Sequence, residues 1–129
     1  MKKSDFRMLV VDDEPELLEI LSEYFELKDF NVFTAESGNK ALEFLDKEKV
    51  DFVLSDIRMP DGDGIHLVKS LRAIDEKEPV IYLYSGQIDK NSLSTDEDLL
   101  MMGVQKLIKK PFATEEIERE IVNFFDIED

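Results

Sequence analysis

Short apolar runs alternate with amphipathic segments along the whole chain. Five runs have the length and apolar continuity of buried strands, at residues 6–11, 31–34, 51–55, 80–84 and 104–108. Between and after them, apolar residues recur at steps of three and four, which is typical of helices that bury one face. Five strand–helix pairs with short connections predict an α/β fold, in which a parallel sheet is covered by helices on both faces.

Local signals indicate where the helices begin and end. Pro15 suits the first turn of a helix that extends to about residue 28. Ser37 is an expected N-cap, and Thr114 is expected to cap the last helix ahead of two glutamates. Gly103 is expected to end a fourth helix within residues 93–102. The expected inner faces consist of Leu17, Leu18, Leu21, Tyr24, Phe25 and Leu27 in the first helix, Ala41, Leu42, Phe44 and Leu45 in the second, Ile65, Val68, Leu71 and Ile74 in the third, and Ile117, Ile121, Val122 and Phe125 in the last.

Composition narrows the class of protein. The chain has 129 residues with a formal net charge of −15, and it has no cysteine, which excludes disulfides and thiolate metal sites. This length fits one core, so residues 1–129 are expected to form a single domain. The negative charge opposes direct binding to nucleic acid or to an anionic membrane. We see no signal peptide and no apolar stretch near the ~20 residues that span a bilayer, so a cytoplasmic location is expected.

Four of the apolar runs end in residues that can handle a phosphoryl group. Asp12 and Asp13 follow the first run, and Asp56 follows the third. Ser85 follows the fourth run, and Lys110 follows the fifth. Because ligand sites of open α/β sheets form at the carboxyl ends of the strands, these side chains are expected to converge at one edge. Three carboxylates, a hydroxyl and an ammonium together suit a divalent cation beside an aspartate that takes up phosphate.

The order and spacing of these residues resemble the receiver domain of bacterial response regulators, over about residues 7–126. The resemblance rests on Asp12-Asp13, on Asp56 within SDIRMPDGDG, on Ser85-Gly86 and on Lys110-Pro111-Phe112. It implies a flavodoxin-like five-stranded parallel sheet in the order 2-1-3-4-5, with five helices on both faces. It also implies a signalling switch of a two-component system, which catalyses only its own phosphorylation and dephosphorylation. The implied partners are a histidine kinase or histidine phosphotransfer protein and an unknown output protein or output domain.

The resemblance implies a role for each residue of the site. Asp56 matches the phosphoacceptor, a carboxylate nucleophile that forms an acyl phosphate. Asp13 matches the carboxylate that binds Mg²⁺, with Mn²⁺ as an alternative, and Asp12, Asp56 and the backbone carbonyl of Arg58 match the other ligands. Such oxygen ligands suit a hard, octahedral cation. Lys110 matches the ion-pair partner of Asp56 and later of the phosphate.

Further positions concern the switch and its output. Ser85 matches the hydroxyl residue that turns toward a phosphate oxygen, and Lys110-Pro111 matches a peptide bond that is cis in this family. Arg58 and Gln87 occupy positions that tune the lifetime of the acyl phosphate. Leu107 stands where receivers commonly carry an aromatic switch residue, and Ser85 and Lys110 lie further apart than usual. We therefore expect an atypical stretch before or within the fourth helix, and a modified version of the usual signalling face formed by helix four, strand five and helix five.

Two other classes of function stay open at this level. The first is a degenerate receiver that acts as a phosphorylation-independent protein-binding module. The second is a phosphatase with an aspartate nucleophile. Such enzymes usually place Asp-x-Asp after the first strand, whereas this chain has adjacent Asp12 and Asp13 and no room for a substrate-covering cap.

Overall fold

Strands and helices alternate strictly in the part of the chain that the structure describes, residues 1–86 and 96–128 of a computed structural model. The strands are β1 (Arg7–Val11), β2 (Asn31–Ala35), β3 (Phe52–Asp56), β4 (Val80–Ser85) and β5 (Lys106–Lys109). The helices are α1 (Pro15–Leu27), α2 (Gly38–Lys47), α3 (Gly64–Ile74), α4 (Asp96–Met101) and α5 (Thr114–Phe124), and a 3-10 turn, η1 (Lys3–Asp5), precedes β1. All strand pairs are parallel, and the order β2-β1-β3-β4-β5 confirms the expected topology.

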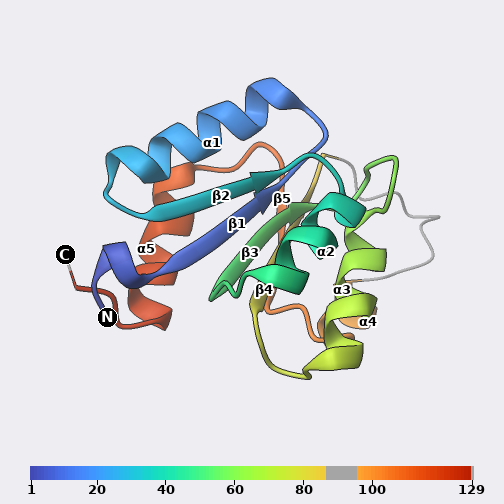
Figure 1. Ribbon diagram of the computed structural model, residues 1–129. Coiled ribbons are helices and arrows are strands. Elements are labelled where there is room, and N and C mark those ends of the chain that lie inside the picture. The colour runs from blue at the N-terminus through green and yellow to red at the C-terminus, as the bar shows by residue number, and fades with distance from the viewer. Residues whose placement is uncertain (87–95, 129) are drawn as a thin grey trace.

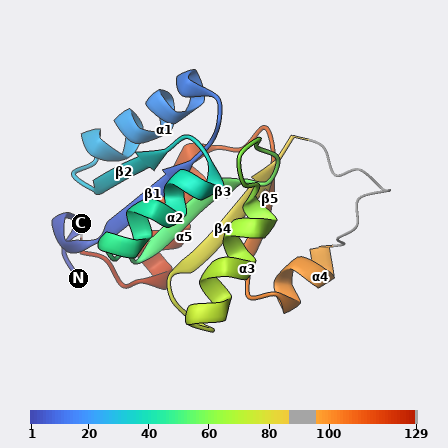
Figure 2. The ribbon, with the colours of Figure 1, turned by 45° about the vertical axis from the view of Figure 1, so that its right-hand side comes forward.

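The sheet separates two layers of helices. Helices α1 and α5 cover one face, while α2, α3 and α4 cover the other (Figure 1). Figure 2 shows the sheet between these two groups of helices. The two chain ends lie close together, and Lys2 and Glu128 form an isolated parallel bridge there. None of the described helices is long and apolar enough to cross a membrane.

Alternation along each strand divides the core into two clusters. On β1, Met8 and Val10 pack toward the α1–α5 layer, and Leu9 and Val11 pack toward the other layer. The central strand β3 is buried along its whole length, which agrees with a continuous apolar run in a sheet covered on both faces. The last residues of β1, β2, β3 and β4 are buried between the two helical layers, whereas Lys109 at the end of the edge strand β5 is exposed.

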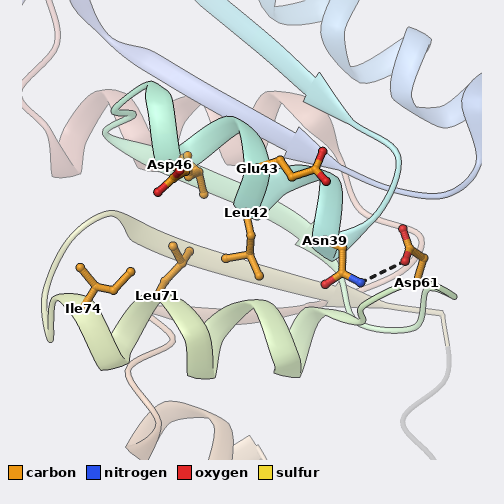
Figure 3. Close-up of a pocket in the computed structure, with 8 residues that line it drawn as sticks. Asn39, Leu42, Glu43, Asp46, Asp61, Leu71 and Ile74 are labelled. Atoms are coloured by element: carbon orange, nitrogen blue, oxygen red, sulfur yellow. Dashed lines mark hydrogen bonds between the residues drawn. The ribbon is translucent and has the colours of Figure 1, made fainter.

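Two apolar residues that were expected inside lie on the surface. Leu27 is 83% exposed because it follows Phe25 by two positions, which places it on the far side of α1. Ile74 is 85% exposed at the last position of α3. It lies beside the hollow between α2 and α3, with Leu42 and Leu71 (Figure 3). In α3, Leu67 takes the buried position that the sequence pattern had not assigned.

Two helix starts differ in their outcome. Ser37 caps α2 as expected, since its Oγ accepts a hydrogen bond from the Lys40 N–H. The expected cap at Thr114 is wrong, because Ala113 occupies the N-cap with an extended backbone and Thr114 is already helical. The acidic first turn of α5 is confirmed. The fourth helix, α4, ends at Met101, and Gly103 follows with a positive φ that suits a helix stop. Residues 93–95, where this helix was also expected, lie outside the described part.

The loop from β3 to α3 is attached to the start of α2. The Asp61 carboxylate accepts hydrogen bonds from the Ser37 hydroxyl and from the Asn39 amide, both at 3.0 Å (Figure 3 draws the second). The Gly38 N–H donates to the Gly62 carbonyl at 2.8 Å. Gly62 has φ +92, and a Cβ on Gly38 would lie 2.4 Å from the Gly62 carbonyl oxygen, so both positions require glycine. This attachment orders the loop that follows Asp56.

Candidate functional site

The predicted site residues meet at the carboxyl edge of the sheet. Backbone hydrogen bonds continue just past the strand ends: the Asp12 N–H donates to the Ala35 carbonyl, and the Lys110 N–H donates to the Ser85 carbonyl at 2.9 Å. In the register of the sheet, Asp56 lies beside Tyr84. These contacts fix where each terminal side chain starts, and so bring residues from four strands to one place.

Three carboxylates form the acidic part of the site. Asp12 is fully buried, Asp56 is 7% exposed and Asp13 is open to solvent. One carboxylate oxygen from each residue lies within 4.8 Å of those of the other two, which is close enough for all three to share one metal ion. This oxygen-only donor set, with one residue facing solvent, fits a hard cation such as Mg²⁺ that keeps several of its waters.

Lys110 supplies the positive charge opposite these carboxylates. Its Nζ lies 3.4 Å from Asp56 Oδ2 and 3.8 Å from Asp12 Oδ2. Burial, and next the charge of Asp12, raise the pKa of Asp56 above its ordinary value. Lys110 and the backbone N–H of Arg58 act in the opposite direction. Asp56 is therefore a carboxylate whose charge is only partly compensated by its protein neighbours.

The remaining predicted residues have separate outcomes. Ser85 is buried at the end of β4, on the same edge as Asp56. The Lys110–Pro111 peptide bond is cis, as expected, and Glu78–Pro79 is also cis, which the sequence analysis did not predict. The Arg58 side chain is exposed, and Gln87 lies outside the described residues. Leu107 on β5 packs with the cluster on the α2–α3–α4 side of the sheet.

Tyr84 belongs to the site, although sequence reasoning did not assign it a role. Its side chain is fully buried, and its hydroxyl donates a hydrogen bond to Asp12 Oδ2 at 2.7 Å. Burial, followed by this hydrogen bond, raises the pKa of Tyr84, so the phenol stays protonated and remains a donor. The sequence shows a tyrosine one position before Ser85, but whether its hydroxyl can contact Asp12 at the end of β1 depends on the order and register of the strands.

A parallel α/β sheet with an acidic cluster, a buried hydroxyl and a lysine at its carboxyl edge is the arrangement that the resemblance to receiver domains predicts. The family model for the response regulator receiver domain matches residues 8–122. The chain therefore belongs to the receiver domains of two-component response regulators. Members of this family receive phosphoryl groups from kinases, normally bind Mg²⁺, and act on output domains.

Relatives with established names agree with this assignment. The transcriptional regulatory protein GlrR of Escherichia coli K12 is 36% identical over 112 residues, which is 86% of this chain and 24% of that protein. The response regulator SaeR of Staphylococcus aureus USA300 is 31% identical over 116 residues, which is 90% of this chain and 49% of that protein. The chain thus spans between about a quarter and about half of the length of these relatives.

Solved structures share the fold. A CheY-like receiver domain protein from Methanospirillum hungatei JF-1 superposes with a TM-score of 0.84 at 23% identity, and covers 94% of both chains. A response regulator receiver protein from Pseudomonas putida has a TM-score of 0.78 at 26% identity, over 92% of this chain and 96% of that chain. The likeness covers nearly the whole chain, including the strands that carry the site.

Proposed function

We propose that this protein is a phosphorylation switch whose acceptor is Asp56, and that phosphoryl transfer to this residue depends on Mg²⁺. The observation that carries the proposal is the grouping of three carboxylates within 4.8 Å of one another, with Lys110 Nζ 3.4 Å from Asp56. A binding module that never takes up phosphate has no need for this grouping, because uncompensated carboxylates at a nearly buried site cost stability.

The proposed reaction is a transfer from phosphohistidine to aspartate. A carboxylate oxygen of Asp56 attacks the phosphorus, the P–N bond to the donor imidazole breaks, and the imidazole leaves with the electron pair of that bond. The donor is a histidine kinase or a histidine phosphotransfer protein. Later hydrolysis of the acyl phosphate returns the carboxylate and releases inorganic phosphate, so the protein ends unchanged.

The residues around Asp56 have distinct parts in this proposal. Asp13, Asp12, Asp56 and the Arg58 carbonyl would hold Mg²⁺, which supplies charge stabilisation to the phosphoryl oxygens when bound. The ammonium of Lys110 lies beside Asp56 Oδ2 and offsets the negative charge that builds up during transfer. Ser85, buried on the same edge, would donate its hydroxyl to a phosphate oxygen. Arg58 and Gln87 would influence how fast water removes the phosphate.

The response is proposed to pass through β5 toward α4 and α5. Lys110 directly follows β5, and Leu107 on that strand packs into the same cluster as Leu99 of α4. Because an aliphatic residue stands at position 107, the change of this face would not use an inward-turning aromatic ring there. The recipient is an output protein or output domain, and a structure of the phosphorylated protein in which β5 and α4 are unchanged would contradict this route.

Incubation with Mg²⁺ and acetyl phosphate tests the function directly. Intact-mass spectrometry should show one added phosphate, which is lost in the Asp56→Asn variant and when EDTA replaces Mg²⁺. Asp46→Asn is a matched control on α2, because that carboxylate is exposed and lies away from the sheet edge. The control should label like the unmodified protein. The absence of an adduct under excess donor would favour the binding-module alternative.

A further inference from the structure

Tyr84 is the largest of the fully buried side chains in the described part of the chain, and it ends at the acidic site. Its hydroxyl donates to Asp12 Oδ2 at 2.7 Å, which is a short distance of the kind seen when the acceptor is charged. The other oxygen, Asp12 Oδ1, accepts the Glu14 N–H at 2.9 Å. Each oxygen of this buried carboxylate therefore has its own donor, and the plane of the carboxylate is fixed from two sides.

The ring of the same tyrosine lies under the lysine of the site. Lys110 Nζ lies 4.9 Å from the centroid of the Tyr84 ring, within the range of a cation–π interaction. The ring also contacts Phe112 at a centroid distance of 5.2 Å. A single side chain thus contacts both the carboxylate that would help to hold the cation and the ammonium that faces Asp56.

Removal of the hydroxyl would leave Asp12 poorly supported. Asp12 has no exposed surface, so water cannot replace the lost donor without a rearrangement. Lys110 Nζ also lies near Oδ2, at 3.8 Å, and it pairs with Asp56 as well. The carboxylate would then turn toward the lysine and draw it away from Asp56.

We propose that Tyr84 is a positioning residue, whose hydroxyl sets the orientation of Asp12 for Mg²⁺ and whose ring holds Lys110 between Asp12 and Asp56. The inference rests on the proposed function for the identity of the cation. Groups that orient the ligands of a metal typically change metal affinity or activity by ~10–100-fold when they are removed. For Tyr84→Phe, which keeps the ring, we expect a ~10-fold higher Kd for Mg²⁺ than in the unmodified protein.

Isothermal titration with Mg²⁺ alone tests the hydroxyl. Tyr82→Phe is the matched control, because Tyr82 is a buried tyrosine on the same strand that contacts Phe52 and not the site. The control should keep the Kd of the unmodified protein. A Tyr84→Phe protein that binds Mg²⁺ as tightly as the control, or more tightly, would overturn the proposal.

A double-mutant cycle separates positioning from a general structural effect. If Tyr84 acts through Asp12, then Asp12→Asn and Asp12→Asn/Tyr84→Phe should have the same Kd for Mg²⁺. A further loss of Mg²⁺ affinity of similar size in the double variant would overturn the proposal, because the tyrosine would then act independently of Asp12.

The ring is tested by the Tyr84→Leu variant. Its labelling by acetyl phosphate at saturating Mg²⁺ should be slower than that of Tyr84→Phe. Equal rates in these two variants would refute the part assigned to the ring.

A measurement on the unmodified residue avoids any dependence on folding of the variants. In protein labelled with ¹³C at the ζ carbon of tyrosine, addition of Mg²⁺ should shift the Tyr84 resonance and leave that of Tyr82 in place. No shift of Tyr84 at saturating Mg²⁺ would count against the proposal. These binding readouts stay informative even if acetyl phosphate gives no adduct, an outcome that would refute only the proposed phosphoacceptor function.

Discussion

Replacement of Asp56 by asparagine should stabilise the protein when no divalent cation is present. Asp56 is 7% exposed, and burial is the largest of the factors that raise its pKa. Asparagine keeps the shape of the side chain and removes the charge that burial and Asp12 disfavour. The residue that we propose as the phosphoacceptor is thus expected to lower the stability of the fold, a common relation between activity and stability.

The magnitude follows from the distances in the site. At an effective dielectric constant of about 20, Lys110 at 3.4 Å attracts Asp56 by about 5 kcal/mol. A carboxylate at 4.8 Å, the outer limit for this cluster, repels it by about 3.5 kcal/mol at the same dielectric. Asp12 therefore offsets most of the attraction by the lysine, and the desolvation of Asp56, the largest cause of its raised pKa, is left uncompensated. We expect Asp56→Asn to raise the free energy of unfolding by about 1–2 kcal/mol in EDTA.

Urea unfolding, carried out once in EDTA and once in Mg²⁺ without EDTA, measures this effect. Because the folded-state pKa of Asp56 is raised, its ionisation costs stability above the pKa of the unfolded state. The advantage of Asp56→Asn should therefore be largest above the folded-state pKa of Asp56 and shrink as the pH falls into the ordinary range of aspartate. Mg²⁺ should narrow the gap at neutral pH by binding the unmodified protein more tightly. A variant that is less stable in EDTA at neutral pH would refute this reasoning.

Three further predictions concern packing and pH. Burial and a 2.6 Å hydrogen bond to Glu118 raise the pKa of Tyr24 from 10.0 to about 12, so Tyr24 supports folding below pH 10.0 and this support is lost as the pH approaches 12. Glu118→Gln should lower the pKa of Tyr24 in an NMR titration, and an unchanged pKa would contradict the assignment. Leu71→Ala should lower the free energy of unfolding by about 2–4 kcal/mol in urea, and Ile74→Ala by less than about 0.5 kcal/mol, because Leu71 is buried and Ile74 is exposed. Equal losses of stability would contradict the exposed position of Ile74. Gly64→Ala should cost about 1–3 kcal/mol in the same assay, because its Cβ would lie 2.5 Å from a backbone carbonyl oxygen at the end of β3, and an unchanged stability would contradict that close approach.

The sheet and most helices could be predicted from sequence because their signals are local and agree with each other. Continuous apolar runs indicate strands that are buried on both faces, and β3 is buried throughout. Periodicity alone could not separate Ile74 from the core, since the end of a helix can extend past the sheet that buries the preceding turns. The prediction of the α5 N-cap was wrong for a related reason. Threonine is a good N-cap residue, but in the folded protein the helix begins one residue earlier than this local signal indicates.

The site was predictable in part for the same reason. Residues that end parallel strands must share one edge, so Asp12, Asp13, Asp56 and Lys110 could be grouped without coordinates. Tyr84 could not, because its hydroxyl reaches Asp12 across β3, and that reach depends on the order of the strands and on burial of the ring. Contacts between side chains of non-adjacent strands leave no periodic signal in the sequence.

A crystal structure with Mg²⁺ and beryllofluoride, a stable mimic of the acyl phosphate, tests the central claim most directly. We predict that the beryllium atom is bound to a carboxylate oxygen of Asp56, and that its fluorides contact Lys110 and Ser85. We also predict that one cation is bound by Asp12, Asp13, Asp56 and the Arg58 carbonyl. Attachment to another residue, or a cation bound away from these carboxylates, would contradict the account.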